Sequence, residues 1–568
     1  MAVTLRALAC STAVAASLRC GDAGTGSVSD GEAASATGAA STGTTAGGVT
    51  TETSGGTSGA QTTGATGSSA GTSTGTSADP STGTTAGSTG GLTEVTGPKF
   101  DVGPADAGDT GGGGGPIIPE TCGQAATAET TVGCLFYAVD LDQNGGLEND
   151  QYAIAVSNVQ LDEQATVVIE QKVGGQWQEV AGPAVVEPLD LEIFPLPNNN
   201  QQGSGVKLDG SWRISADVPI IAYQFNPLAA GAFSSDASML YPVTSWDYVN
   251  LVVHWGEGYG RGYITIVASA DNTVVEVTPS VITAGGPGVP PGAPGVPFQI
   301  MLDEGEIAEV AVSNEHAALT GTRVLADEDH PVAVFSGHEC AWIPLGKVAC
   351  DHVEEQLSGV RLWGNSFAAA RVPVREPAQP ETSLWQVVAS EDDTLVTIEA
   401  HADVTGLPMT PATLNKGEML QFFAGGTPAN PGDLVIEADK PIAVANYMTG
   451  FGNLSMGNLG DPAMVQLAPY EQFLPRYVVL VPDQWDNDVL VITRPAGAEV
   501  MLDDVPIAPD LFQPFGDVWE AGRVPVTDGV HRLEGDEPFS VLVVGYDGAD
   551  SYAYLGGSST GVINPTPQ

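Results

Sequence analysis

The sequence predicts an all-β protein of about four tandem β-sandwich-like modules that follow a disordered N-terminal stalk. Residues 120–560 alternate short runs of Val, Ile, Leu, Tyr and Trp with Gly, Pro, Asn and Asp, which is typical of strands and turns. One phrase recurs four times along this region, and convincing helix patterns are nearly absent. Together these observations indicate repeated β modules.

The recurring phrase sets the module length. It reads ADVPIIAY, DHPVAVFS, ADKPIAVANY and DEPFSVLVVGY, around Pro219, Pro331, Pro441 and Pro538. The spacing of about 100 residues is that of a sandwich module, whereas a propeller blade needs about 40–50. A β-propeller-like closure is the alternative, and a merged architecture in which the modules share strands is a third. We expect each proline just before a strand begins, where no ladder donor is needed.

Two segments within the modules predict hairpins. Residues 263–278 read YITIVAS, a polar turn Ala-Asp-Asn, and TVVEVT. Residues 384–399 repeat this order, with LWQVVAS, Glu-Asp-Asp and TLVTIE. Two alternating runs joined by a short polar turn indicate paired antiparallel strands.

Residues 1–20 resemble an export signal, because an early Arg6 precedes a run of small and apolar residues. Cys20 is the candidate lipidation site, since a lipoprotein carries its diacylglycerol on the first mature cysteine. Arg19 departs from the small residue that normally precedes this cysteine. We therefore expect a lipid-anchored protein at the cell surface or outer membrane, and the alternative is cleavage near Ala16 and secretion.

Residues 21–119 are almost entirely Gly, Ser, Thr and Ala. A segment of this composition cannot bury a core and is expected to be a flexible stalk.

Charge excludes some partners. The chain has 18 Lys and Arg against 69 Asp and Glu, a formal charge of −51, so it will not attract nucleic acid or anionic lipid. No apolar stretch reaches the length of a membrane helix. Contact with a membrane is expected only through the N-terminal lipid.

Four cysteines of residues 120–560 form two close pairs, Cys122 with Cys134 and Cys340 with Cys350. In an exported protein, local disulfides are the natural interpretation, and neither pair has the C-x-x-C spacing of a redox or zinc site. Free buried thiols are the alternative.

Two loops contain weak candidates for metal ligands, although we expect no cofactor. Asp140, Asp142 and Asn144 have the spacing of the first positions of a calcium loop. Gln151 stands where that loop needs Glu, and a solvated hairpin loop explains the same residues. His338 and His352 flank the second cysteine pair, where zinc would suit imidazole ligands, and a hydrogen-bonded structural loop is the alternative.

Enzymatic motifs are missing from the sequence. Ser336-Gly337-His338 lacks the glycines of a nucleophile elbow. The Gly-rich segment 254–262 has no Lys-Ser/Thr and is interpreted as a flexible loop. A pair of carboxylates that hydrolyses glycosides is a minor alternative, for which the sequence selects no residues.

Six motifs occur in order along the chain, namely GCLFYAVDLDQ (133–143), YAIAVSN (152–158), AYQFNPL (222–228), FSGHECAWIP (335–344), CDHVEEQL (350–357) and GYDGADSYAYLGG (545–557). Through these motifs the region from Pro119 to Gly557 resembles the IgGFc-binding protein N-terminal domain family. The resemblance implies an extracellular, non-catalytic binding or adhesive domain. The antibody partner that names the family is not carried over to this chain.

The expected function is therefore that of a cell-surface binding or adhesion protein with an unknown protein or glycan partner. Exposed loops would bind the partner, and Trp246, Tyr248, Trp255 and Tyr259 are candidate anchors if they are not core residues. A structural component of the envelope or extracellular matrix without a specific ligand is the alternative.

Overall fold

The computed structural model describes residues 118–228, 234–565 and 567. These residues are almost entirely strands, loops and short 3-10 turns, which confirms the all-β class. The export signal, Cys20 and residues 21–117 of the expected stalk lie outside the described residues.

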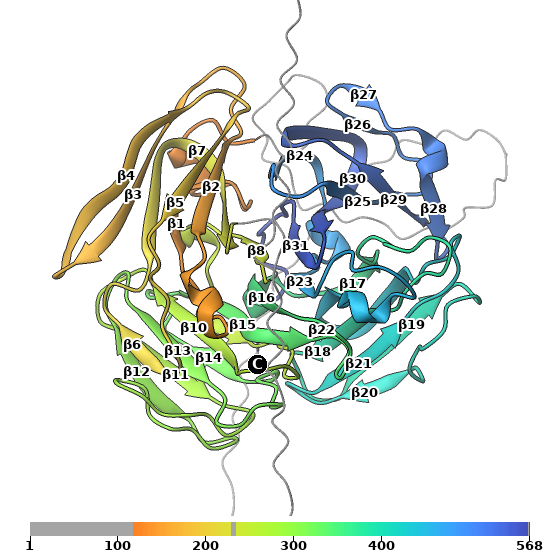
Figure 1. Cartoon of the computed structure of the whole chain (residues 1–568). Coiled ribbons are helices and arrows are strands. Elements are labelled where there is room, and N and C mark those ends of the chain that lie inside the picture. The colour runs from red at the N-terminus through yellow and green to blue at the C-terminus, as the bar shows by residue number, and fades with distance from the viewer. Residues whose placement is uncertain (1–117, 229–233, 566, 568) are drawn as a thin grey trace, which may run out of the picture. The chain divides into compact units, whose positions relative to one another are not determined.

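The strands form four modules in chain order (Figure 1). The first contains α1 Cys122–Ala125, β1 Gly133–Ala138, η1 Gly145–Asn149, β2 Tyr152–Asn158, β3 Ala165–Val173, β4 Gln176–Val186, β5 Leu191–Leu196, β7 Trp212–Asn226 and β8 Asp236–Met239. The second contains η2 Val243–Ser245, β9 Val249–Leu251, β10 Gly262–Ala268, β11 Thr273–Thr278, β12 Phe298–Leu302, β13 Ile307–Ala311, β14 Arg323–Leu325, β15 Val332–Trp342 and β16 Cys350–Gln356.

The last two modules have the same order of strands. The third contains η3 Val360–Leu362, β17 Gly364–Ala369, β18 Ser383–Ala389, β19 Thr394–Ala400, β20 Ala412–Leu414, β21 Met419–Ala424, β22 Leu434–Met448, η4 Phe451–Asn453 and β23 Ala463–Gln466. The fourth contains η5 Tyr470–Gln472, β24 Leu474–Val481, β25 Asn487–Pro495, β26 Val500–Leu502, β27 Val505–Pro506, η6 Pro509–Leu511, β28 Phe512–Phe515, β29 Trp519–Pro525, β30 Gly529–Asp547 and β31 Asp550–Leu555.

Each module has two layers, and three of the modules join them through one long strand. In module one, the first half of β7 pairs with β1 and β3, and its second half pairs with β2 and β8. β22 and β30 play the same role in modules three and four. Module two divides this strand into β14 and β15, and it adds β6 (Gly205–Lys207) from the sequence of module one. The modules are therefore curled sandwiches. Modules one and two share the strand β6, as expected for the alternative architecture in which modules share strands.

The repeated prolines mark the corner between the two layers. Pro219, Pro441 and Pro538 lie inside β7, β22 and β30, at positions without a ladder partner. The expectation that each proline lies just before a strand is correct only for Pro331, which precedes β15. Where a strand passes from one layer to the other, its corner residues make no ladder hydrogen bond. A proline, which has no backbone N–H, therefore loses no hydrogen bond at this position.

The two predicted hairpins are wrong in their pairing. β10 pairs with β13 and β15, whereas β11 pairs with β12 and β14 in the other layer. β18 and β19 likewise pair with different halves of β22. The turns at Asn272 and Asp393, which have positive φ, therefore cross from one layer to the other.

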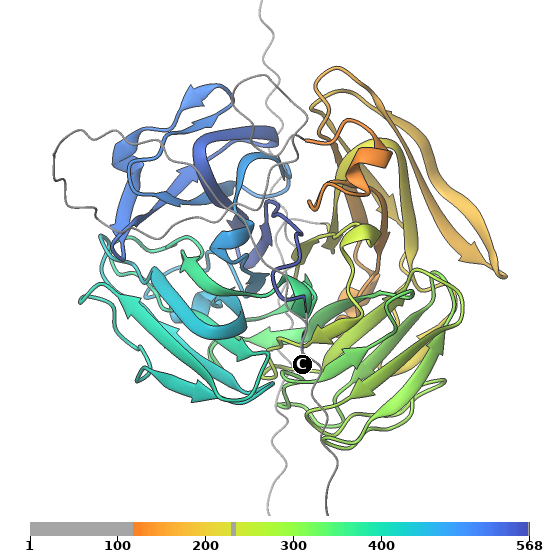
Figure 2. The same ribbon diagram turned by 180° about the vertical axis from the view of Figure 1, so that it is seen from behind.

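The last strand of each module lies at the centre of the molecule. β8 contacts β16 and β31, and β23 contacts the same two strands, so the four strands complete a ring (Figures 1 and 2). The structure therefore combines sandwich modules with the closure that the sequence left as the alternative. Near the first and last described residues, Thr130 forms an antiparallel β-bridge with Ser559.

Side chains connect these inner strands. The carboxylate of Asp236 on β8 accepts hydrogen bonds from the backbone N–H groups of Glu354, Met464 and Ala553, one on each of the other three inner strands, at 3.0–3.2 Å. Ser234 and Ser238 accept from the N–H groups of His352 and Gln356. Because the neighbouring strands form no backbone ladder, these oxygens satisfy N–H groups that would otherwise be buried without a partner.

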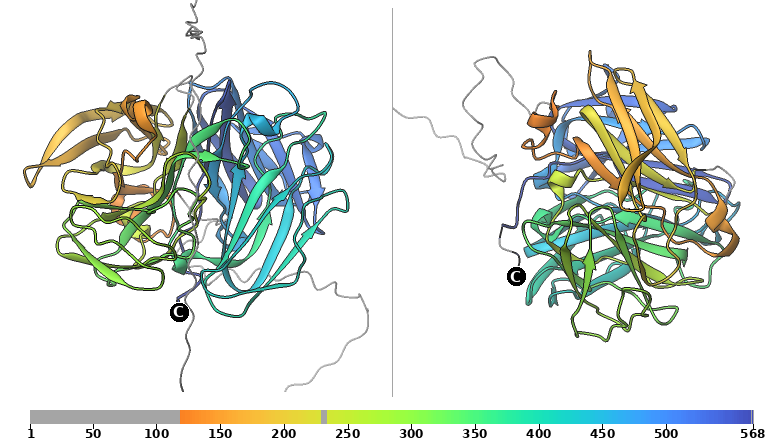
Figure 3. Two further views of the ribbon diagram at one scale, coloured as in Figure 1. Left: turned by 60° about the horizontal axis from the view of Figure 1, so that its bottom comes forward. Right: turned by 90° about the vertical axis from the view of Figure 1, so that its left-hand side faces the viewer.

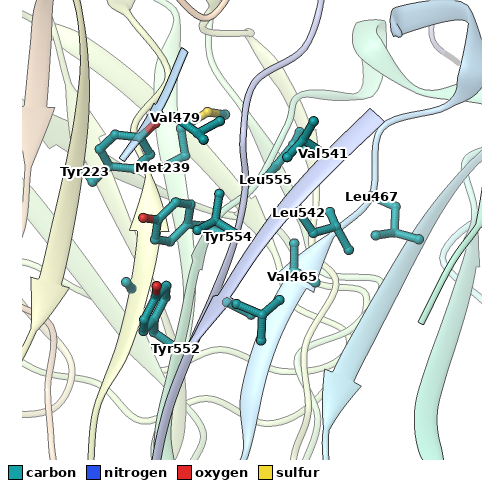
Figure 4. Close-up of a cluster of buried hydrophobic side chains, with 14 of the residues drawn as sticks. Tyr223, Met239, Val465, Leu467, Val479, Val541, Leu542, Tyr552, Tyr554 and Leu555 are labelled. Atoms are coloured by element: carbon teal, nitrogen blue, oxygen red, sulfur yellow. The ribbon is translucent and has the colours of Figure 1, made fainter. Parts of the chain in front are cut away.

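Apolar side chains fill the space around the ring. Tyr223 of β7 packs against Tyr554 of β31 with ring centroids 4.7 Å apart. Figure 4 shows these rings with Met239, Val465 and Leu542 from three further strands. The core therefore runs from one module into the next, and the modules depend on one another.

We expect Asp236→Asn to lower the free energy of unfolding by at least about 2 kcal/mol, because an amide has one acceptor oxygen where the carboxylate has two. Urea unfolding followed by tryptophan fluorescence measures the change. Asp162→Asn, at an exposed position, is the control. Equal stability of the two variants would contradict the role of Asp236.

Candidate functional site

The loops at one end of the inner strands form a continuous surface, here called the loop face. It comprises residues 143–151, 254–261, 343–349, 373–382 and 449–462. Hydrogen bonds join loops of modules two and three, from Gly450 N to Ile343 O (2.7 Å) and between Gly452 N and Val348 O. Within module three, Arg375 Nη1 donates to Leu459 O (3.1 Å). In the right-hand view of Figure 3, η1 lies on this side and α1 on the opposite side. Loops bonded to one another in this way form a defined surface.

Four large apolar side chains are exposed on the loop face. The exposed fractions are 58% for Tyr259, 51% for Leu345, 65% for Val348 and 80% for Met456. Tyr259 N donates to Cys340 O (2.8 Å), which joins its backbone to the base of the loop that carries Leu345 and Val348. Exposed apolar groups gathered on one surface are typical of a binding site.

Both cysteine pairs form disulfides, Cys122–Cys134 and Cys340–Cys350. The second bond closes the base of the loop with Leu345 and Val348, between the ends of β15 and β16. It therefore limits the conformations of the loop that presents two of the apolar side chains.

Acidic side chains also belong to the loop face. Glu148, Glu257 and Glu376 lie on the loop face and are partly exposed. Lys347 and Arg261 are the basic side chains of these loops outside the buried Arg371–Glu381 network. The surface potential of this face is therefore negative.

The calcium-like loop does not present its acids to solvent. Asp140 and Asp142 are each 4% exposed, and they accept hydrogen bonds from Asn199 N (2.6 Å) and Gly203 N (3.0 Å). Burial raises the pKa of both to about 7. Asn144 donates to Glu339 Oε2 (3.5 Å). The solvated-hairpin interpretation is wrong, because the segment joins β1 to β2 in different layers and its acids bind another loop.

His338 and His352 are also buried. His338 Nδ1 accepts from Cys340 N (3.0 Å), and His352 Nε2 lies 3.5 Å from Glu354 Oε2. Burial lowers the pKa of His352 to about 3 and that of His338 well below its usual value. Among residues 118–228 and 234–565, no three His, Cys, Asp or Glu side chains form a group that could hold a metal ion.

The Gly-rich segment 254–262 is closely packed rather than a flexible loop. A Cβ on Gly258 would lie 2.2 Å from the ring of His338, and one on Gly262 would lie 2.2 Å from the ring of His254. The glycines are needed here because the imidazoles lie directly against the backbone. Of the candidate aromatic anchors, Trp246 and Trp255 are core residues and Tyr259 is exposed.

The sequence did not predict that four acids meet at the axis. Asp236, Asp351, Asp461 and Asp550 lie at or next to the start of the four inner strands, and all are buried. Burial raises the pKa of Asp351 well above its usual value, and the other three acids raise it further. Their recurrence after each proline phrase is a signal in the sequence. No such signal marks the exposed side chains of Leu345, Val348 and Met456, because the tertiary fold decides which apolar side chains are exposed.

The fold and the loop face define a class, that of binding modules built from β repeats. Within the part of the chain that the structure describes, no helix is long and apolar enough to cross a membrane.

The comparison with protein families agrees with this class. The model of the IgGFc binding protein family matches residues 236–545, which is more than half of the chain, so the chain belongs to this family. Its members are extracellular, non-enzymatic binding domains. No curated protein and no solved structure matches the chain.

The buried carboxyl groups predict how stability depends on pH. Burial raises the pKa of Asp140, Asp142 and Asp461 to about 7 in the folded protein, from the ordinary aspartate value of 3.8. A carboxyl group with a raised pKa binds its proton more tightly when folded, so lowering the pH from 8 to 7 should increase the free energy of unfolding by about 1 kcal/mol or more.

Below pH 6.5 two histidines should offset part of this increase. The pKa of His254 is lowered to about 4 and that of His352 to about 3, so their protonation in the unfolded chain opposes folding there. Urea titrations at several pH values measure both effects, and Asp142→Asn should reduce the slope between pH 8 and 7 while the exposed control Asp162→Asn leaves it unchanged. Stability that falls from pH 8 to 7 would contradict this assignment.

Proposed function

We propose that the protein is an exported, non-catalytic binding protein that holds a protein partner on its loop face. The observation that supports this most directly is the set of four exposed apolar side chains on disulfide-closed and hydrogen-bonded loops. Membership of a family of extracellular binding domains supports the same class.

The loop face has the composition of a protein interface. Large apolar side chains at its centre supply most of the binding free energy once water is displaced, and a polar rim excludes solvent around them. The loops are already held by bonds between modules, so binding orders few additional residues.

The partner surface is basic. The chain carries a formal charge of −51, and Glu148, Glu257 and Glu376 lie on the loop face. Attraction to a positive surface raises the rate of association and discriminates against acidic proteins.

The folded modules are displayed at a cell surface. Residues 1–20 act as the export signal, Cys20 carries the lipid, and residues 21–119 space the modules from the membrane. Two or three acyl chains anchor a protein stably, whereas one chain binds only marginally.

Replacing three of the apolar side chains should abolish partner binding. We expect the triple variant Leu345→Ser, Val348→Ser and Met456→Ser to lose at least about a hundredfold in affinity, because it removes the buried apolar contacts. Proximity labelling on living cells identifies neighbouring proteins, and surface plasmon resonance measures their affinity for the purified chain.

The matched control replaces Leu161, Val505 and Met409 by Ser, three residues that are 60%, 65% and 94% exposed outside the loop face. This variant should bind as the unmodified protein does, and binding should weaken with increasing salt. A partner that binds both triple variants equally, or the absence of any saturable partner, would contradict the proposal.

The anchor is tested separately. Mass spectrometry of the mature N-terminus should show an acylated peptide that begins at Cys20, and Cys20→Ser should release the protein from the membrane fraction. An unmodified terminus upstream of Cys20, with the protein in the medium, would contradict lipid anchoring.

A further inference from the structure

A cavity lies beside α1, which is on the opposite side of the molecule from η1 of the loop face (Figure 3). Its volume is about 180 Å³, and it is lined by residues 125–127, Glu129, Thr130, 244–247, 361–362, Thr560 and Val562. We call it the closure pocket, because the first and last described segments meet there. Thr560 N donates to Glu129 O (2.7 Å), and Thr131 N donates to Ser558 O (3.2 Å).

The guanidinium of Arg361 is the main unsatisfied donor of the closure pocket. Its Nε is buried and has no hydrogen-bond partner, and Nη1 lies 3.9 Å from Asp247 Oδ1, beyond hydrogen-bond distance. The guanidinium lies 5.2 Å from the ring centroid of Tyr248, which fixes its plane. A planar guanidinium with an N–H donor left unpaired favours a ligand that carries oxygen acceptors.

Acceptors and hydroxyls complete the lining. Glu129 is exposed and lines the same pocket as Arg361, and its Oε2 lies beside Gly561. Five hydroxyl side chains also line it, namely Thr127, Thr130, Thr244, Ser245 and Thr560. Ser245 Oγ donates to Thr560 Oγ1 (3.1 Å), so part of this hydroxyl set is already ordered.

The charges of the pocket exclude a simple ion. Glu129 and Asp247 repel an anion, as does the strongly negative chain, and Arg361 repels a cation. A neutral ligand that both donates and accepts hydrogen bonds satisfies all of these groups. Adjacent hydroxyl groups do this, because each donates to a carboxylate and accepts from a guanidinium.

Size limits the ligand further. The volume corresponds to roughly six water molecules at about 30 Å³ each, which accommodates one sugar ring and not an oligosaccharide. Apolar atoms of Leu362 and Val562 on the lining can face the C–H groups of such a ring.

We propose that the closure pocket binds a single neutral saccharide residue, such as the end of a glycan chain, with Arg361 and Glu129 as its polar contacts. This site is separate from the loop face, and it does not depend on a protein partner being bound there.

Saturation-transfer NMR of the purified chain with a panel of neutral hexoses and N-acetylhexosamines tests the proposal. At least one sugar should bind, and Arg361→Gln and Glu129→Gln should each weaken it at least tenfold. The matched controls are Arg476→Gln and Glu534→Gln, an exposed ion pair elsewhere whose two side chains are each 41% exposed. Thermal unfolding of every variant verifies that it is folded.

Three outcomes would overturn the assignment. They are no binding by any neutral sugar, binding that both pocket variants retain, and binding only of inorganic phosphate or of an acidic sugar added as probes. The loop-face triple variant should still bind the saccharide, so failure of this proposal and failure of the proposed function give different results.

Discussion

The architecture depends on which acceptors bind the backbone N–H groups at the inner edges of the four sandwich modules. A strand at the edge of a sheet carries unpaired N–H groups, and burying them without partners is costly. Here the inner strands do not form a backbone ladder with one another, and side-chain oxygens accept these hydrogens instead. Asp236 alone serves all three of the other inner strands. The positions of the loops at one end of the ring and of the closure pocket at the other follow from this arrangement.

Much of this fold was predictable from local sequence patterns. The proline phrases identified four modules of sandwich length because a two-layer module repeats its corner once per copy. The pairing of residues 263–278 was not predictable, because an alternating pair of runs with a polar turn fits a hairpin and an arch between layers equally well. The long strands, such as Trp212–Asn226, decide between a hairpin and an arch, because the two halves of a long strand pair with different strands.

The functional surfaces were less predictable than the fold. Proximity was enough to pair the cysteines, since a short loop in an oxidising compartment favours local bonds. The acids of the calcium-like loop were misinterpreted as solvated because their partners, Asn199 N and Gly203 N, are about 60 residues away in the chain. No local pattern distinguishes an exposed Leu345 from a core leucine, and Arg361 became notable only when its neighbours were known.

Rigidity links the ring to binding at both of its ends. The inner strands are short, and their backbone N–H groups are held by side chains that are themselves buried, so the ring has few alternative conformations. Loops and pocket residues anchored to such a ring lose little conformational entropy when a ligand binds. A preorganised domain of this kind can bind tightly through a small number of apolar contacts, which is what the loop face offers.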